Sequence, residues 1–272
     1  MRSKYVDVEG VAVNFFHSGE STLPHQPPAL DRGELIVFLH DAGANANLWH
    51  RQGEILAADH SVLAFDFPGH GRSGGTEGLD SVAAQAGFLD AFVHAVGLRP
   101  MVLVGKGFGA ATALEYGALH GRQVRGLVLI GCSPRVEVAE TTLGEWGDVM
   151  RGRRPQPFSK NEFSSATSLD VMREVWMEQV RTDPRVRYTD LVAWGEADFS
   201  SRLTDVRQPV LVVAGSEDEV VRPEASQELC PQLPNVRLEV VEKAGHSIEL
   251  EQPEALAERI GGFVSSLDRD AA

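Results

Sequence analysis

The chain has 272 residues, 43% of them hydrophobic, and a formal net charge of −14 at pH 7. A chain of this length and apolar content can bury a large core, and α/β domains of this size often form one unit. Nucleic acids and anionic membranes attract basic surfaces, so the acidic balance argues against both as partners. We expect one domain with an insertion.

Cysteine usage and the N-terminal stretch indicate the compartment. The two cysteines, Cys132 and Cys230, lie far apart in the sequence and form neither a disulfide framework nor a metal-ligand motif. The first ten residues, MRSKYVDVEG, lack the apolar segment of a signal peptide. No run approaches the roughly 20 apolar residues that a membrane span needs. A cytoplasmic protein without metal or membrane contacts is expected.

The elements follow in chain order. Residues 5–8 and 11–16 alternate in polarity around Glu9 and Gly10 and predict an antiparallel hairpin, and the proline-containing stretch 18–32 predicts a loop. Short apolar runs bounded by turn residues then predict buried strands at residues 35–39, 61–65, 101–104, 124–130, 209–214 and 236–241. Helical periodicity predicts helices at residues 44–58, from 81 onward, after 109, at 224–229 and from 253 onward.

Strands that alternate with helices favour an α/β fold with a mostly parallel sheet covered on both faces. The alternation stops between residues 132 and 205, where prolines separate segments of helical periodicity such as 169–181. That segment also holds three of the four tryptophans. We therefore predict a core made of residues 1–131 and 206–272 and an inserted helical cap at 132–205.

The strand at 101–104 runs into GKGFG at residues 105–109. This is the spacing of a nucleophile elbow, G-x-S-x-G, in which a strand turns sharply into a helix and presents one side chain above the sheet. Gly107 occupies that position and has no attacking atom. Glycine tolerates backbone angles that strain other residues by about 1–3 kcal/mol. The sequence thus predicts an elbow without its nucleophile.

The motifs and their order resemble the α/β-hydrolase superfamily over nearly the whole chain apart from the cap. The motifs that carry the resemblance are HDAG from His40, DFPGHGRS from Asp66, GKGFG from Gly105, and the late pair GSEDEVV and AGHSIELEQPE. Each motif follows a predicted strand, where open parallel sheets place their ligands. The resemblance implies an α/β-hydrolase fold that needs no cofactor or metal.

The resemblance also implies roles for particular residues. Asp218 matches the acid of the family's triad, and His246 matches the base. The backbone N–H groups of Phe108 and Ala42 match the oxyanion hole. At position 107 the chain departs from the family, because no acyl-enzyme forms on glycine.

A histidine held by a carboxylate remains a general base without the serine. We expect the missing side chain to leave the oxyanion hole available and to make room for a water near Nε2 of His246. His246 would then activate water for hydrolysis, or take a proton from the substrate in lyase, isomerase or cyclase chemistry. The expected substrate is a small apolar carbonyl compound.

Two alternatives stay open. The chain is a serine ester or lactone hydrolase inactivated by the replacement of serine with glycine at position 107, or it is a non-catalytic protein that binds a ligand in the pocket. The presence of both His246 and Asp218 counts against the second alternative, because a binding pocket has no need of them.

Five further side chains are candidates for substrate binding, namely His40, Lys106, Phe67, Trp146 and Trp176. The alternative for each residue is a purely structural role. The aromatic residues then pack in the core of the cap, and His40 binds nearby backbone. Lys106 packs its stem and points its amine outward.

Overall fold

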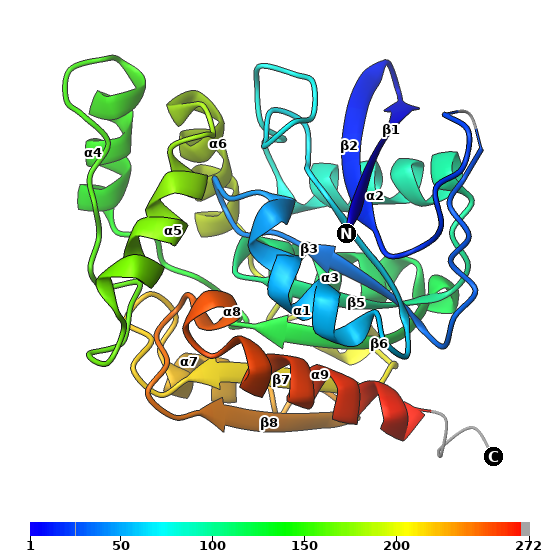
Figure 1. The fold of residues 1–272 in the computed structure, drawn as a ribbon. Helices are drawn as coiled ribbons and strands as arrows, with labels where there is room; N and C mark the ends of the chain where they lie inside the picture. The colour runs from blue at the N-terminus through cyan, green and yellow to red at the C-terminus, as the bar shows by residue number, and fades with distance from the viewer. Residues whose placement is uncertain (25, 268–272) are drawn as a thin grey trace.

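The computed structural model describes residues 1–24 and 26–267, whose strands form one eight-stranded sheet (Figure 1). The strands are β1 (Arg2–Val8), β2 (Val11–His17), β3 (Leu35–Leu39), β4 (Ser61–Phe65), β5 (Met101–Lys106), β6 (Val124–Ile130), β7 (Val210–Gly215) and β8 (Val236–Val241). Their spatial order is β1-β2-β4-β3-β5-β6-β7-β8. The predicted strands are all present, with bounds that shift by a few residues at most.

The sheet is antiparallel at one edge and parallel elsewhere. β1 pairs with β2 and β2 with β4 in the antiparallel sense, and all pairs from β4 to β8 are parallel. The antiparallel hairpin and the predicted α/β class are therefore confirmed. β3 and β5 are direct neighbours, with Leu39 opposite Gly105, so the loops that follow these two strands lie side by side.

The side chains of the buried strands point alternately to the two faces of the sheet and pack in two separate cores. Leu35, Val37 and Leu39 of β3 pack in one core with α2 and α3, whereas Ile36 and Phe38 pack in the other with α1 and α9. In Figure 1, α1 and α9 cover one face of the sheet. Because both faces are covered, the strands read as continuous apolar runs, as the sequence predicted.

The helices are α1 (His50–Leu56), α2 (Val82–Val96), α3 (Phe108–Leu119), α4 (Glu140–Met150), α5 (Leu169–Gln179), α6 (Pro184–Gly195), α7 (Pro223–Gln227), α8 (Ile248–Glu251) and α9 (Pro253–Leu267). Short 3₁₀ turns are η1 (Ala46–Trp49), η2 (Gly121–Gln123) and η3 (Leu203–Asp205). The helix predicted at residues 44–58 is divided into η1 and α1. Asn45 caps η1 by accepting a hydrogen bond from the backbone N–H of Asn47.

Three helices, α4, α5 and α6, lie between β6 and β7 in the sequence. They stand together at the end of the sheet toward which the arrows of β6 and β8 point (Figure 1). This is the end at which the loops after the parallel strands gather. Whether residues 132–205 are a cap in the functional sense stays a prediction.

None of the helices among the described residues is both long enough and apolar enough to span a bilayer.

Close packing of α3 on β5 depends on Gly105. A Cβ atom at this position would lie 2.3 Å from the carbonyl oxygen of Gly109 and 2.6 Å from the backbone nitrogen of Ala110. Backbone atoms cannot move away cheaply, so Gly105→Ala is expected to lower the free energy of unfolding by about 1–3 kcal/mol. Urea denaturation measures this change.

The matched control is Gly87→Ala in α2, where an added Cβ meets no atom within 4 Å. This substitution is expected to raise the free energy of unfolding by about 0.5–1 kcal/mol, because alanine favours the helix. Equal effects of the two substitutions would contradict the packing argument.

Candidate active site

The elbow lies where β5 passes into α3. Gly107 has φ 51° and ψ −114°, a conformation that only glycine adopts without strain. Its backbone N–H donates a hydrogen bond to the carbonyl oxygen of Ile130 at 2.9 Å. The chain thus keeps the sharp strand-to-helix turn of a nucleophile elbow while presenting no side chain there.

His246 and Asp218 are in direct hydrogen-bond contact. Nδ1 of His246 lies 2.8 Å from Oδ2 of Asp218, and both side chains are buried. The other oxygen of Asp218 accepts hydrogen bonds from the backbone N–H groups of Val220 and Val221, each at 2.8 Å. These contacts fix the carboxylate, which in turn orients the imidazole. The catalytic role of the pair stays a prediction.

A second carboxylate, which the sequence reasoning did not single out, contacts the other side of the imidazole. Oδ2 of Asp41 lies 3.0 Å from Nε2 of His246. Oδ1 of Asp41 accepts hydrogen bonds from the backbone N–H groups of Ala42 at 2.7 Å and Phe108 at 2.9 Å. The two N–H groups expected to form the oxyanion hole therefore do converge on one oxygen atom, and that oxygen belongs to Asp41.

This contact corrects two sequence-based expectations. The hole is not left available, because Oδ1 of Asp41 accepts from both of its donors. Nor is the space beside Nε2 of His246 left for a water, because Oδ2 of Asp41 lies there. A carboxylate supplied by the loop after β3 occupies the space that a side chain at position 107 would fill.

In its observed position, Asp41 leaves no room for a side chain at position 107. A Cβ atom built on Gly107 would lie 2.0 Å from Oδ1 of Asp41 and 2.5 Å from its Cγ. Carbon and oxygen atoms that are not bonded do not approach so closely, so the Asp41 carboxylate would have to move if position 107 carried a side chain. In the sequence the two residues stand in separate motifs, Asp41 in HDAG and Gly107 in GKGFG. Only the adjacency of β3 and β5 brings the two together.

Lys106 and Glu249 form a buried ion pair next to this carboxylate. Nζ of Lys106 lies 2.9 Å from Oε1 of Glu249 and 4.0 Å from Oδ2 of Asp41. The expectation that the Lys106 amine points outward is therefore wrong, since this residue is only 4% exposed. Its charge is balanced within the site rather than by solvent. Burial acts to lower the pKa of Lys106, but Glu249 and Asp41 raise it well above its ordinary value.

The carboxylates of Asp218 and Asp41 raise the pKa of His246. Burial alone would lower its pKa, but the charge of Asp218 and the hydrogen bonds to Asp218 and Asp41 raise it from 6.5 to about 10. For Asp41, burial acts to raise the pKa, but His246, Lys106 and the N–H of Phe108 hold it well below its ordinary value. At neutral pH the site therefore holds an imidazolium between two carboxylates.

Both ring nitrogens of His40 form hydrogen bonds with backbone groups. Its Nδ1–H donates to the carbonyl oxygen of Asp41 at 2.9 Å, and its Nε2 accepts from the N–H of Phe67 at 3.2 Å. Burial and the neighbouring His70 lower the pKa of His40 to about 4, which keeps the ring neutral as this pattern requires. Phe67 packs edge-on against the His40 ring. Both residues shape the loop that carries Asp41.

The tryptophans occupy different surroundings. The guanidinium of Arg187 lies 4.4 Å from the centroid of the Trp146 ring, and Trp176 packs edge-on against Phe158. Trp194 was not among the candidates, and its ring centroid lies 6.3 Å from that of His246. Substrate binding by Trp146 and Trp176 stays a prediction.

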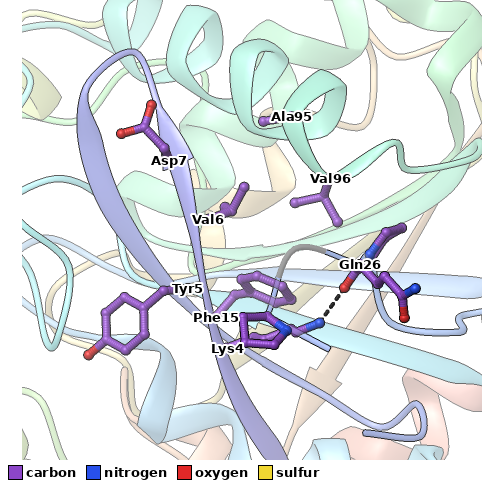
Figure 2. Close-up of a pocket in the computed structure, with 10 residues that line it drawn as sticks. Lys4, Tyr5, Val6, Asp7, Phe15, Gln26, Ala95 and Val96 are labelled. Atoms are coloured by element: carbon purple, nitrogen blue, oxygen red, sulfur yellow. Dashed lines mark hydrogen bonds between the residues drawn. The ribbon is translucent and has the colours of Figure 1, made fainter. Parts of the chain in front are cut away.

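Three cavities lie away from the contact between Asp41 and His246. The largest, about 630 Å³, is lined by residues of the β6–β7 segment and of the loop after β7, and it reaches Asp218. A cavity of about 210 Å³ lies between the N-terminal hairpin and the end of α2, where Lys4, Phe15 and Val96 line it (Figure 2). Gly107, Asp41 and His246 line none of the three. The side chains of Asp41 and His246 are in direct contact in this conformation.

A metal site is not formed by the described part of the chain, where no group of three or more His, Cys, Asp or Glu side chains is arranged to hold an ion.

Comparisons with known proteins agree with the fold. A model of the alpha/beta hydrolase family matches residues 36–259. The chain is 27% identical over 260 residues to an esterase of Mycobacterium tuberculosis, covering 85% of this chain and 83% of the esterase. It is 29% identical over 240 residues to a non-heme haloperoxidase of Rhodococcus erythropolis, covering 79% of this chain and 86% of the haloperoxidase. The enol-lactonase of Burkholderia xenovorans LB400 has a similar fold, with a TM-score of 0.82 and 19% identity over 96% of this chain and 99% of that one.

Introducing a serine at position 107 is expected to give no esterase activity unless Asp41 is also replaced. In Gly107→Ser the new side chain would clash with Asp41, and the serine backbone would be strained. This variant should therefore have a lower melting temperature and should not hydrolyse p-nitrophenyl acetate. Gly107→Ser combined with Asp41→Gly should hydrolyse this ester in a His246-dependent manner. The control is Gly144→Ser, since a Cβ at Gly144 meets no atom within 4 Å. An active single variant would refute the exclusion.

Removing the charge of Asp41 is expected to lower the pKa of His246. In Asp41→Asn the pKa of His246 should fall from about 10 toward its ordinary 6.5, because one of two carboxylates is lost. An NMR titration of the imidazole measures this, with the exposed Asp198→Asn as control. In the unaltered chain, the raised pKa contributes stability that is fully present below pH 6.5 and is lost as the pH rises through about 10. An unchanged titration in Asp41→Asn would contradict the assignment.

Proposed function

Because the chain belongs to the alpha/beta hydrolase family, we propose that it is an enzyme that acts on a small, mainly apolar substrate without a serine nucleophile. His246 is the proton-transferring group and Asp218 orients it. The single observation that carries the proposal is the direction of the imidazole. Asp218 holds Nδ1 of His246, and Nε2 lies 3.0 Å from Oδ2 of Asp41, the carboxylate that occupies the space of a side chain at Gly107. Hydrolysis is the reaction class that the relatives favour, since those that match the chain include an esterase.

The finer expectation of a carbonyl substrate places a condition on Asp41. The carbonyl oxygen would have to bind where Oδ1 of Asp41 now accepts hydrogen bonds from Ala42 and Phe108. Asp41 must therefore rotate out of the hole before such a substrate reacts. The same rotation removes a carboxylate from His246, lowers the pKa of the imidazole and makes it a base for water or for a substrate C–H.

A non-catalytic binding protein is the second candidate, and the filled oxyanion hole favours it. Intramolecular groups compete with ligands at very high effective concentrations. A hole that is permanently occupied by Asp41 would serve only to hold the loop after β3. The expected cytoplasmic location and the independence from cofactors are part of the proposal and rest on the sequence.

The proposal predicts that the base matters in turnover. His246→Ala is expected to lower kcat by about 10²–10⁴-fold on any compound that the wild type transforms, because a positioned general base contributes this much. The panel consists of short esters, lactones and enolisable ketones, with wild type and Gly144→Ser as matched references. A wild type that transforms no compound of the panel, although ligands raise its melting temperature, would favour the binding protein.

A further inference from the structure

We propose that Asp41 is the nucleophile of this site and that its Oδ2 attacks a saturated carbon that carries a leaving group. The inference rests on the proposed function in one respect, since His246 must act as the base in the second half of the reaction. It adds the attacking atom, which the elbow lacks, and a substrate class.

The position of the carboxylate is the first support. A Cβ atom on Gly107 would lie within 2.8 Å of both oxygens of Asp41, so the carboxylate occupies the volume of the absent nucleophile. Oδ2 lies 3.0 Å from Nε2 of His246, at hydrogen-bond distance as a serine hydroxyl is in a triad. The acid, the base and an attacking oxygen are thus all present, although the oxygen comes from the loop after β3.

The oxyanion hole is the second support. Oδ1 of Asp41 already accepts from the N–H groups of Ala42 and Phe108. When Oδ2 carries an ester, Oδ1 is its carbonyl oxygen and stays between the same two donors. The negative charge that develops when water attacks Cγ therefore falls on an atom that is already held there. No substrate oxygen has to displace Asp41 for this reaction.

The chemistry of a carboxylate decides the substrate class. Attack on an ester carbonyl would form an anhydride, which is more reactive than the ester it came from. Attack on a saturated carbon forms a stable ester instead. In this step the bond between Oδ2 and carbon forms, and the bond to the leaving group breaks with its electron pair. Alkyl halides and epoxides are small, mainly apolar compounds of this kind.

The second half of the reaction returns the enzyme to its starting state. Esterified Asp41 has no charge, so His246 loses one of the two carboxylates that hold its proton and releases that proton to the leaving anion or to solvent. Neutral His246 then takes a proton from water as the water oxygen bonds to Cγ of Asp41. The tetrahedral group collapses, the bond between Cγ and Oδ2 breaks, and the departing alkoxide takes the proton from His246. The second proton of the water, left on the new oxygen of Asp41, then passes to His246 and restores the carboxylate and the imidazolium. One water is consumed for each alcohol formed.

Lys106 completes the electrostatics of the resting site. Its Nζ lies 4.0 Å from Oδ2 of Asp41 and is held there by the buried Glu249. This positive charge favours the ionised form of Asp41 before reaction. In the proposed reaction Lys106 is a positioning residue and does not touch the substrate.

Trapping of the covalent intermediate tests the proposal. His246→Asn is incubated with 1-bromobutane and with styrene oxide, and the protein is digested for peptide mass spectrometry. The expected result is an alkyl adduct on Asp41 that accumulates, because the variant lacks the base that hydrolyses it. Asp198, which is exposed, reports non-specific esterification in the same digest. An unmodified Asp41 with both probes overturns the proposal.

Turnover in water labelled with oxygen-18 gives a second readout in the wild type. A nucleophilic Asp41 acquires the isotope, and Asp41→Asn should lose about 10⁴-fold or more in kcat/KM. A labelled alcohol with unlabelled Asp41 means that His246 activates water directly, which overturns the role of Asp41 and leaves the proposed function standing. Absence of both turnover and adduct with the two probes also overturns it.

Discussion

The site depends on one interaction, the binding of the Asp41 carboxylate by the backbone N–H groups of Ala42 and Phe108. Charge-assisted hydrogen bonds of this length are about twice as strong as neutral ones. They join the loop after β3 to the start of α3 and place the second oxygen against His246. The same carboxylate occupies the space of a side chain at position 107. Together with Asp218, it keeps a proton on the imidazole. Sterics and charge at the elbow are therefore linked through one side chain.

The fold was accessible from the sequence because local patterns determine it. β3, β4 and β6 coincide in both bounds with apolar runs flanked by turn residues. Gly107 was recognisable because the elbow spacing fixes its place between β5 and α3. His246 and Asp218 were singled out because they match the base and the acid of the α/β-hydrolase triad, each in a motif after a late strand.

The arrangement of charged groups at the centre was not accessible in the same way. The position of Asp41 depends on β3 lying beside β5, and its side-chain direction depends on donors from two separate segments. The direction of Lys106 was predicted wrongly because lysine usually keeps its amine in water, whereas here Glu249, 143 positions later, receives it. Contacts between residues so far apart leave no periodic signal in a single sequence.

Asp190 of α6 links the helical segment between β6 and β7 to this centre. It is fully buried, and its Oδ2 accepts hydrogen bonds from the backbone N–H of Gly43 and from Nε2 of His70, both at 2.8 Å. Gly43 is two residues beyond Asp41, so α6 anchors the loop that delivers the carboxylate. A chimera that exchanges the segment for that of a relative would inherit a correctly aimed Asp41 only if the graft supplied an acid at the Asp190 position.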